Sequence, residues 1–112
     1  MNPILVNPVD WQNHEVIFND EEFSAVWGQY KGNFCLGTRW NGESENERGY
    51  PGQGAHPLWF VIPEYLTLSV LEKLNIISIQ RELRNEKGES YSIRINNAIG
   101  EVINIANTVE QN

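Results

Sequence analysis

The stretch from Asn41 to Pro57 constrains the fold most, because it has the periodicity of neither a helix nor a strand. Glycine and proline recur through it, at Gly42, Gly49, Pro51, Gly52, Gly54 and Pro57. Loops longer than about 12–15 residues are uncommon in compact domains and are usually functional or disordered. We therefore expect a long Gly-rich loop over residues 41–57, with any binding site on or beside it.

Two segments before this loop predict strands. Residues 14–18 alternate weakly between apolar and polar side chains, after an extended lead-in over residues 1–13. Residues 33–40 alternate clearly, which places Cys35, Gly37 and Arg39 on one face of the predicted strand. Gly37 leaves a gap on that face, and we expect a bulge or a bulky neighbouring side chain to account for it.

The residues between these strands predict a helix. Asn19 and Glu22 have the spacing of a capping box, and the apolar residues that follow recur at helical spacing. The pattern predicts a helix over residues 20–30. A hairpin that turns at Lys31-Gly32 is the alternative, because Gly28 would lie inside the helix.

After the loop, the pattern predicts one strand and at least two helices. Residues 58–62 are apolar on both faces, which indicates a central strand covered on two sides. A helix is expected from Glu64, with an apolar stripe formed by Leu66, Val70, Leu71 and Leu74. Residues 75–95 fit either an extension of that helix to about residue 84 or a hairpin turning at residues 86–89. Residues 97–109 predict a final helix.

These elements predict an α+β fold, with a small antiparallel or mixed sheet of three to five strands and two or three helices. The length of 112 residues fits a single domain, residues 1–112. The lone Cys35 cannot form an internal disulfide and is expected to be a small buried apolar residue. No apolar run approaches the ~18 residues that span a membrane, and the start of the chain does not resemble a signal peptide. We therefore expect a cytoplasmic protein.

The charge of the chain restricts its partners. Fifteen acidic and eight basic residues give a net charge of −7. Such a surface disfavours nucleic acid and anionic membranes, and it would steer the protein toward a basic protein partner. The sequence leaves the oligomeric state open, with a homodimer as one option.

The candidate ligand-binding residues belong to the loop and its borders: Arg39, Trp40, Arg48, Tyr50, His56 and Trp59. The cationic and imidazole side chains could bind a small anionic ligand between aromatic walls. The structural alternative places Trp40 and Trp59 in the core and pairs the arginines with nearby glutamates. No catalytic residues, metal ligands or cofactor are expected, because neither a nucleotide-binding motif nor a calcium loop is matched.

One resemblance covers residues 35–63. The strings Cys35-Leu36-Gly37-Thr38-Arg39-Trp40-Asn41-Gly42, Gly49-Tyr50-Pro51-Gly52-Gln53-Gly54 and Pro57-Leu58-Trp59-Phe60-Val61-Ile62-Pro63 carry it. This region resembles small bacterial proteins of the kind encoded on mobile integron gene cassettes. The resemblance implies a bacterial accessory protein and brings no shared activity with it.

Three functions are compatible with the sequence. The first is a non-catalytic binding protein with a small-ligand or peptide site between residues 39 and 59. The second is an acidic interaction protein, such as an immunity protein or antitoxin, that neutralises a basic partner. The third is a small enzyme that uses His56 with Arg39 or Arg48. The scarcity of nucleophiles and acid–base pairs ranks the enzyme last.

Overall fold

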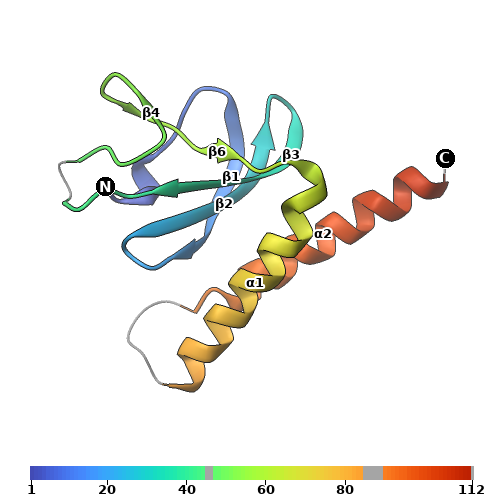
Figure 1. The fold of residues 1–112 in the computed structure, drawn as a ribbon. Helices are drawn as coiled ribbons and strands as arrows, with labels where there is room; N and C mark the ends of the chain where they lie inside the picture. The colour runs from blue at the N-terminus through green and yellow to red at the C-terminus, as the bar shows by residue number, and fades with distance from the viewer. Residues whose placement is uncertain (45–46, 85–89, 112) are drawn as a thin grey trace. The chain divides into compact units, whose positions relative to one another are not determined.

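Strands occupy the first half of the chain and helices the second (Figure 1). The computed structural model describes residues 1–44, 47–84 and 90–111. Over these residues the elements are a short 3-10 helix η1 (Pro3–Leu5), strands β1 (Trp11–Asn19), β2 (Phe23–Tyr30), β3 (Asn33–Trp40), β4 (Gly52–Gln53), β5 (His56–Pro57) and β6 (Phe60–Val61), and helices α1 (Glu64–Leu83) and α2 (Ser92–Gln111). The predicted α+β class is confirmed.

The strands form two antiparallel sheets. The larger has the order β1-β2-β3-β6, and β4 pairs with β5 in a separate two-stranded sheet. The strand predicted over residues 33–40 has the bounds of β3, and the one predicted over residues 14–18 is part of the longer β1. The lead-in is shorter and less extended than predicted, because η1 interrupts it and β1 begins at Trp11.

The helix predicted over residues 20–30 is wrong, because these residues form the β1–β2 turn and β2. The Asn19 side chain accepts the Glu21 N–H at 3.0 Å, and the Asp20 side chain accepts the Phe23 N–H at 2.7 Å. Asparagine and aspartate satisfy backbone donors in the same way at a helix start and in a turn, so the capping pattern fitted both. Glu21 has φ +79°, a left-handed conformation that no helix start contains.

The alternative hairpin at Lys31-Gly32 is the correct one. Tyr30 pairs with Asn33 across a two-residue turn, and both turn residues have positive φ, 49° at Lys31 and 86° at Gly32. Two positive φ values define the type I′ turn, whose twist matches that of the flanking strands. Gly28 is required for a separate reason, because a β-carbon there would overlap the backbone of His14 on β1.

One face of the larger sheet carries a buried hydrophobic cluster. Val6, Trp11, Val26 and Trp59 form this cluster. The gap at Gly37 is filled by a bulky side chain, as predicted, because a β-carbon there would lie 3.0 Å from the Trp11 ring. The Trp59 indole N–H donates to the Val6 carbonyl at 3.0 Å, which joins the lead-in to the segment before β6.

The prediction of a central strand over residues 58–62 is wrong. In the described part of the chain, β6 has two residues and pairs with β3 at the edge of the sheet. Trp59 is buried at 5% exposure, whereas Phe60 is 54% exposed. Pro57 and Pro63 lack the N–H that a strand interior needs, so they limit the length over which this segment can pair.

Residues 65–112 form a compact unit distinct from residues 1–64, and each is described by itself. Helix α1 extends to Leu83, so the helical alternative for residues 75–83 is correct, and the turn predicted at residues 86–89 lies outside the described residues. Its buried residues are Thr67, Leu71, Leu74 and Ser78. This line differs from the predicted stripe, and Leu66 is exposed. Two of the buried residues, Thr67 and Ser78, are small and polar, so a pattern of hydrophobic residues alone could not predict the buried face of α1.

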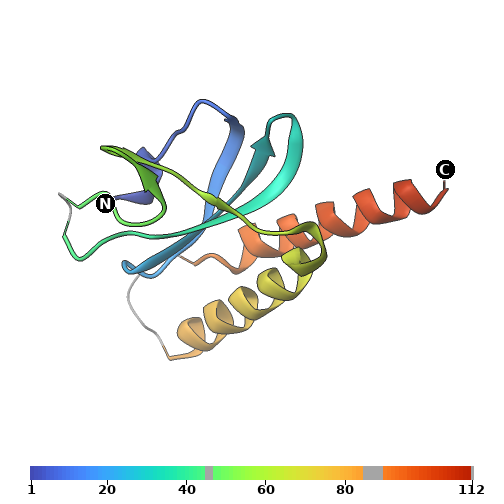
Figure 2. The same ribbon diagram turned by 45° about the horizontal axis from the view of Figure 1, so that its top comes forward.

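Helix α2 begins at Ser92, earlier than the predicted start at residue 97, and runs in the opposite direction to α1 (Figures 1 and 2). The Glu82 carboxylate accepts the hydroxyls of Ser90 and Ser92, which lowers the pKa of Glu82. The Asn96 side chain donates to that of Asn75 at 3.0 Å across the helix pair. No described helix is both long and apolar enough to cross a bilayer.

Cys35 should react slowly with Ellman's reagent in the folded protein. Its side chain packs against the core cluster, and burial raises the pKa of the thiol, which disfavours the reactive thiolate. Labelling followed by absorbance should therefore accelerate strongly when urea unfolds the chain. An exposed thiol made by Ser44→Cys in a Cys35→Ser background provides the fast control. Equal native rates for the two variants would contradict this prediction.

Candidate functional site

The six predicted site residues fall into two groups. Arg39 and Trp59 are buried, with Arg39 only 1% exposed. Trp40, Tyr50 and His56 are exposed, and Arg48 is intermediate. The structural alternative was therefore right for Trp59 and wrong for Trp40.

Arg39 joins three points of the segment that follows β3, the backbone carbonyls of residues 48, 51 and 58. Its Nη1 donates to the carbonyls of Leu58 and, at 3.4 Å, of Pro51, and its Nη2 donates to the carbonyl of Arg48. The guanidinium also lies over the Trp59 ring, 5.8 Å from its centroid. Burial first, and then the nearby charge of Arg48, lower the pKa of Arg39. Arginine stays protonated in proteins, so these are hydrogen bonds from a buried cation.

The described residues of the predicted loop include regular structure, namely the strands β4 and β5 and an isolated bridge. Trp40 and Tyr50 exchange two backbone hydrogen bonds of 2.7 and 2.9 Å, and the Leu58 N–H donates to the Pro51 carbonyl at 3.0 Å. The Arg48 side chain lies against Gly52 and donates to the Gly54 carbonyl. Both arginines thus bond to backbone carbonyls of the segment. Binding of an anion by these side chains stays a prediction.

Three aromatic residues form a row across the end of the larger sheet. Phe23 on β2 pairs with Trp40 on β3, and Trp40 pairs with Tyr50 through an isolated bridge. Directly opposed residues of antiparallel strands project from the same face, so the three side chains are neighbours. The rings of Phe23 and Trp40 meet edge to face, with centroids 5.2 Å apart. We call Phe23, Trp40 and Tyr50 the aromatic row.

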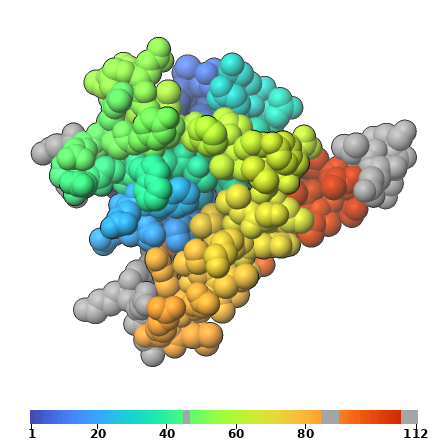
Figure 3. All heavy atoms as spheres, in the orientation of Figure 1, coloured from blue at the N-terminus to red at the C-terminus, as the bar shows by residue number. Residues whose placement is uncertain are grey.

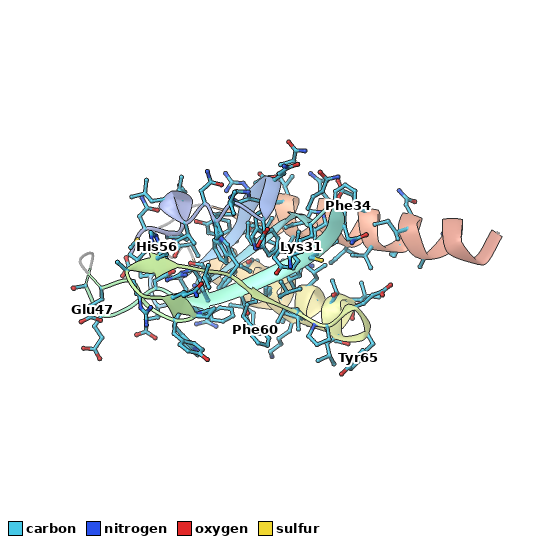
Figure 4. All side chains as sticks on the ribbon, turned by 90° about the horizontal axis from the view of Figure 1, so that it is seen from above. Lys31, Phe34, Glu47, His56, Phe60 and Tyr65 are labelled. Carbon is cyan, nitrogen blue, oxygen red and sulfur yellow. The ribbon has the colours of Figure 1, made fainter. Side chains whose placement is uncertain are left out.

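The aromatic row is accessible. Trp40 is 56% exposed and Tyr50 is 66% exposed, although both backbones are fixed by hydrogen bonds. Phe60 pairs with Thr38, two positions before Trp40 on β3, so it projects from the same face as a diagonal neighbour. Its side chain points away from the ribbon in Figure 4. The apolar surface therefore extends from the aromatic row along the edge of the sheet.

Exposed carboxylates border the aromatic row. The Asn41 N–H donates to the Glu22 carbonyl at 2.7 Å, which brings the β1–β2 turn against the start of the 41–50 segment. Figure 3 shows the two segments adjoining on one face. Among the described residues of these segments, the exposed glutamates are Glu21, Glu22, Glu43 and Glu47, which we call the acidic rim. In the unit of residues 1–64, which we call the sheet unit, Glu21 and Glu22 precede β2 and Lys31 follows it, so they lie at opposite ends of that strand. Figure 4 shows that Glu47 also lies away from Lys31.

Phe23 was not predicted as a site residue, because its surroundings in the sequence predicted a helix. A signal was nevertheless present. A two-residue turn at Lys31-Gly32 fixes the register of the hairpin and places Phe23 opposite Trp40. The pairing of Trp40 with Tyr50 could not be found in this way, because it depends on the path of residues 41–49.

Among the described residues, no group of three or more His, Cys, Asp and Glu side chains is placed to hold a metal ion. His56 lies on the exposed β4–β5 hairpin, where it pairs with Gln53. The aromatic row and the acidic rim are thus the surface features that the sheet unit presents at this end.

Comparisons with protein families, with curated proteins and with solved structures found no match for this chain.

Proposed function

We propose that this chain is a non-catalytic binding protein whose site is the aromatic row. The observation that carries the proposal is the exposure of Trp40 and Tyr50 side by side on hydrogen-bonded backbone. Tryptophan and tyrosine are enriched at the energetic centres of protein interfaces, because each contributes a large contact area with few rotatable bonds. A peptide segment of a partner protein is the ligand that these exposed aromatic side chains favour.

The site is supported by a backbone that needs little rearrangement. Arg39 gathers carbonyls from both sides of Tyr50, those of Arg48 and Pro51, and so restrains the strand-like segment that carries the ring. Binding to a preorganised surface loses less conformational entropy than binding to a flexible loop. The structural role of Arg39 therefore supports binding at Trp40 and Tyr50.

The enzyme alternative with His56 is less well supported. It requires the guanidinium of Arg39 or Arg48 to approach a substrate. Both groups instead donate to carbonyls of residues 48–58, and Arg39 is buried. A reaction at this site would have to break those hydrogen bonds, whereas binding at the aromatic row leaves them in place.

Replacing Trp40 by alanine should abolish most peptide binding without unfolding the protein. Peptides selected against the wild type from a library of short random sequences provide the probe. We expect Trp40→Ala to weaken their binding at least about tenfold, since central interface tryptophans often contribute ~2 kcal/mol or more. Titration calorimetry measures the affinities, and a thermal melt should stay close to that of the wild type.

Phe34→Ala is the matched control. Phe34 is an exposed aromatic residue on the same strand, but it lies at the other end of β3, stacked on Trp27 with centroids 5.9 Å apart. Its loss should leave the affinity of the selected peptides unchanged. If the library yields no peptide whose binding depends on Trp40, the proposed function is wrong.

A further inference from the structure

We infer that the aromatic row recognises an arginine side chain in a basic segment of a partner protein, with the acidic rim supplying the complementary charge. This inference rests on the proposed function, since it names the chemistry of the ligand that the same site takes. Its basis is the arrangement of exposed glutamates next to exposed rings at one end of the sheet.

Every member of the aromatic row has an exposed glutamate close to it along the chain. Glu22 directly precedes Phe23, Glu43 is the third residue after Trp40, and Glu47 is the third before Tyr50. Three residues of extended chain span at most about 10–11 Å, so each carboxylate stays near its ring. A cation bound at the aromatic row would therefore have several carboxylates in its neighbourhood.

The sheet unit has few cations with which to neutralise this rim. Residues 1–64 contain nine acidic and three basic side chains, which leaves a net charge of −6. Arg39 is buried, Arg48 donates to the Gly54 carbonyl, and the Met1 amino group donates to the carbonyls of Asn41 and Ser44, which flank Glu43. Lys31 follows β2 at the far end of the sheet, where its Nζ lies 5.4 Å from the Tyr30 ring centroid. The negative field at the aromatic row is thus available to a partner.

The carboxylates differ in how far the protein uses them itself. Asp20 accepts the N–H groups of Glu22 and Phe23 and therefore belongs to the turn. Glu47 accepts the Glu43 N–H through Oε2 at 2.8 Å, which holds residues 43 and 47 close together. Glu22 and Glu43 are the members of the acidic rim best suited to test, because no described fold contact depends on their carboxylates being ionised.

Arginine fits this surface better than lysine does. The guanidinium is planar, so it can stack on an indole face while it donates two parallel hydrogen bonds to a carboxylate. An ammonium group is a more strongly hydrated point charge and cannot make both contacts in that way. Acidic or phosphorylated ligands would be repelled by the rim, whose charges act over about 8 Å at physiological salt.

Four peptides that differ at one position test the inference: an arginine peptide and its lysine, citrulline and glutamate counterparts, each with the same flanking glycines and serines. Citrulline keeps the shape of arginine but is neutral. The Trp40 indole N–H signal reports binding in nitrogen–proton NMR titrations. We expect the arginine peptide to bind at least about tenfold more tightly than the citrulline peptide, with lysine between them and glutamate weakest.

Glu22→Gln and Glu43→Gln should each weaken the binding of the arginine peptide several-fold and leave the affinity for the citrulline peptide unchanged. Asp10→Asn is the control, because it removes one charge from an exposed residue next to the Lys31 turn. If Asp10→Asn reduced the preference for the arginine peptide over the citrulline peptide as much as the glutamate variants do, the effect would come from net charge alone, and the inference would be overturned. Equal binding of the arginine and citrulline peptides would also overturn it.

The proposed function can survive the failure of this inference. If library-selected peptides bind at Trp40 but the arginine peptide does not, the site is a binding site of another specificity. If sedimentation shows self-association that Trp40→Ala removes, the occupant is a second copy of the chain and the inference is wrong. If no peptide of any kind shifts the Trp40 signal, the proposed function fails as well.

Discussion

Replacing Arg39 by alanine is expected to lower the free energy of unfolding by about 3–5 kcal/mol, because hydrogen bonds from a charged donor contribute about 1.5–3 kcal/mol each. The carbonyls of Arg48, Pro51 and Leu58 would each lose their charged donor in a site that water does not reach easily. The Pro51 carbonyl still accepts the Leu58 N–H, so the carbonyls of Arg48 and Leu58 are the two acceptors left without a donor. An unsatisfied buried acceptor costs about 1–3 kcal/mol, and these two account for the size of the effect. Urea denaturation followed by tryptophan fluorescence measures it.

Two variants distinguish the hydrogen bonds of the Arg39 guanidinium from the effect of removing its positive charge. Arg39→Lys keeps the positive charge, but an ammonium group cannot reach the carbonyls of both Arg48 and Leu58 as the guanidinium does. The stability of this variant should therefore lie between that of Arg39→Ala and that of the wild type. Arg48→Ala removes the side chain that donates to the Gly54 carbonyl and should cost about 1 kcal/mol. If Arg39→Ala were as stable as the wild type and had lost a stabilisation by added anions, Arg39 would be a ligand-binding residue instead.

The parts of the fold that could be predicted are those decided by neighbouring residues. Strand β3 was predicted with correct bounds, because alternation over residues 33–40 is uninterrupted. The hairpin at Lys31-Gly32 was predicted only as the alternative to a helix, because Gly28 would have lain inside that helix. The same local chemistry misled at Asn19 and Asp20, whose side chains satisfy turn donors as well as they would cap a helix.

The candidate site could be predicted only in part, because its geometry depends on contacts between distant residues. Trp40 and Tyr50 were both named from sequence, yet nothing local indicated that they would be paired and exposed. Arg39 alternates with apolar residues on β3 and could equally have faced solvent. Its burial follows from carbonyls that residues 48–58 bring to it, which no periodicity encodes.

Trp59→Ala is expected to be as destabilising as the loss of Arg39, by about 3–5 kcal/mol. The indole is buried in the cluster with Val6, Trp11 and Val26, and its truncation would leave a cavity that the surrounding sheet cannot close. It would also leave the Val6 carbonyl without the indole N–H that it accepts at 3.0 Å. Chemical denaturation with a calorimetric melt measures the loss.

The neighbouring aromatic residue supplies the control. Phe60→Ala should cost less than about 1 kcal/mol, because more than half of this side chain is already in contact with solvent. Trp59→Phe should cost an intermediate amount, since it retains a ring but loses the hydrogen bond to Val6. If Phe60→Ala were more destabilising than Trp59→Ala, Phe60 and not Trp59 would be the buried residue, and the description of this edge strand would be wrong.

Trp59 and Arg39 should also be energetically coupled. The guanidinium lies 5.8 Å from the Trp59 ring centroid, so each residue forms part of the other's buried environment. Once Trp59→Ala has removed the ring, the cation loses its aromatic contact and gains space that water can enter, and a further Arg39→Ala change then costs less than it does alone. A double-mutant cycle on unfolding free energies should give a coupling of about 0.5–2 kcal/mol, the range typical of cation–π pairs. Additive losses would mean that Arg39 acts through its three carbonyls without help from the ring.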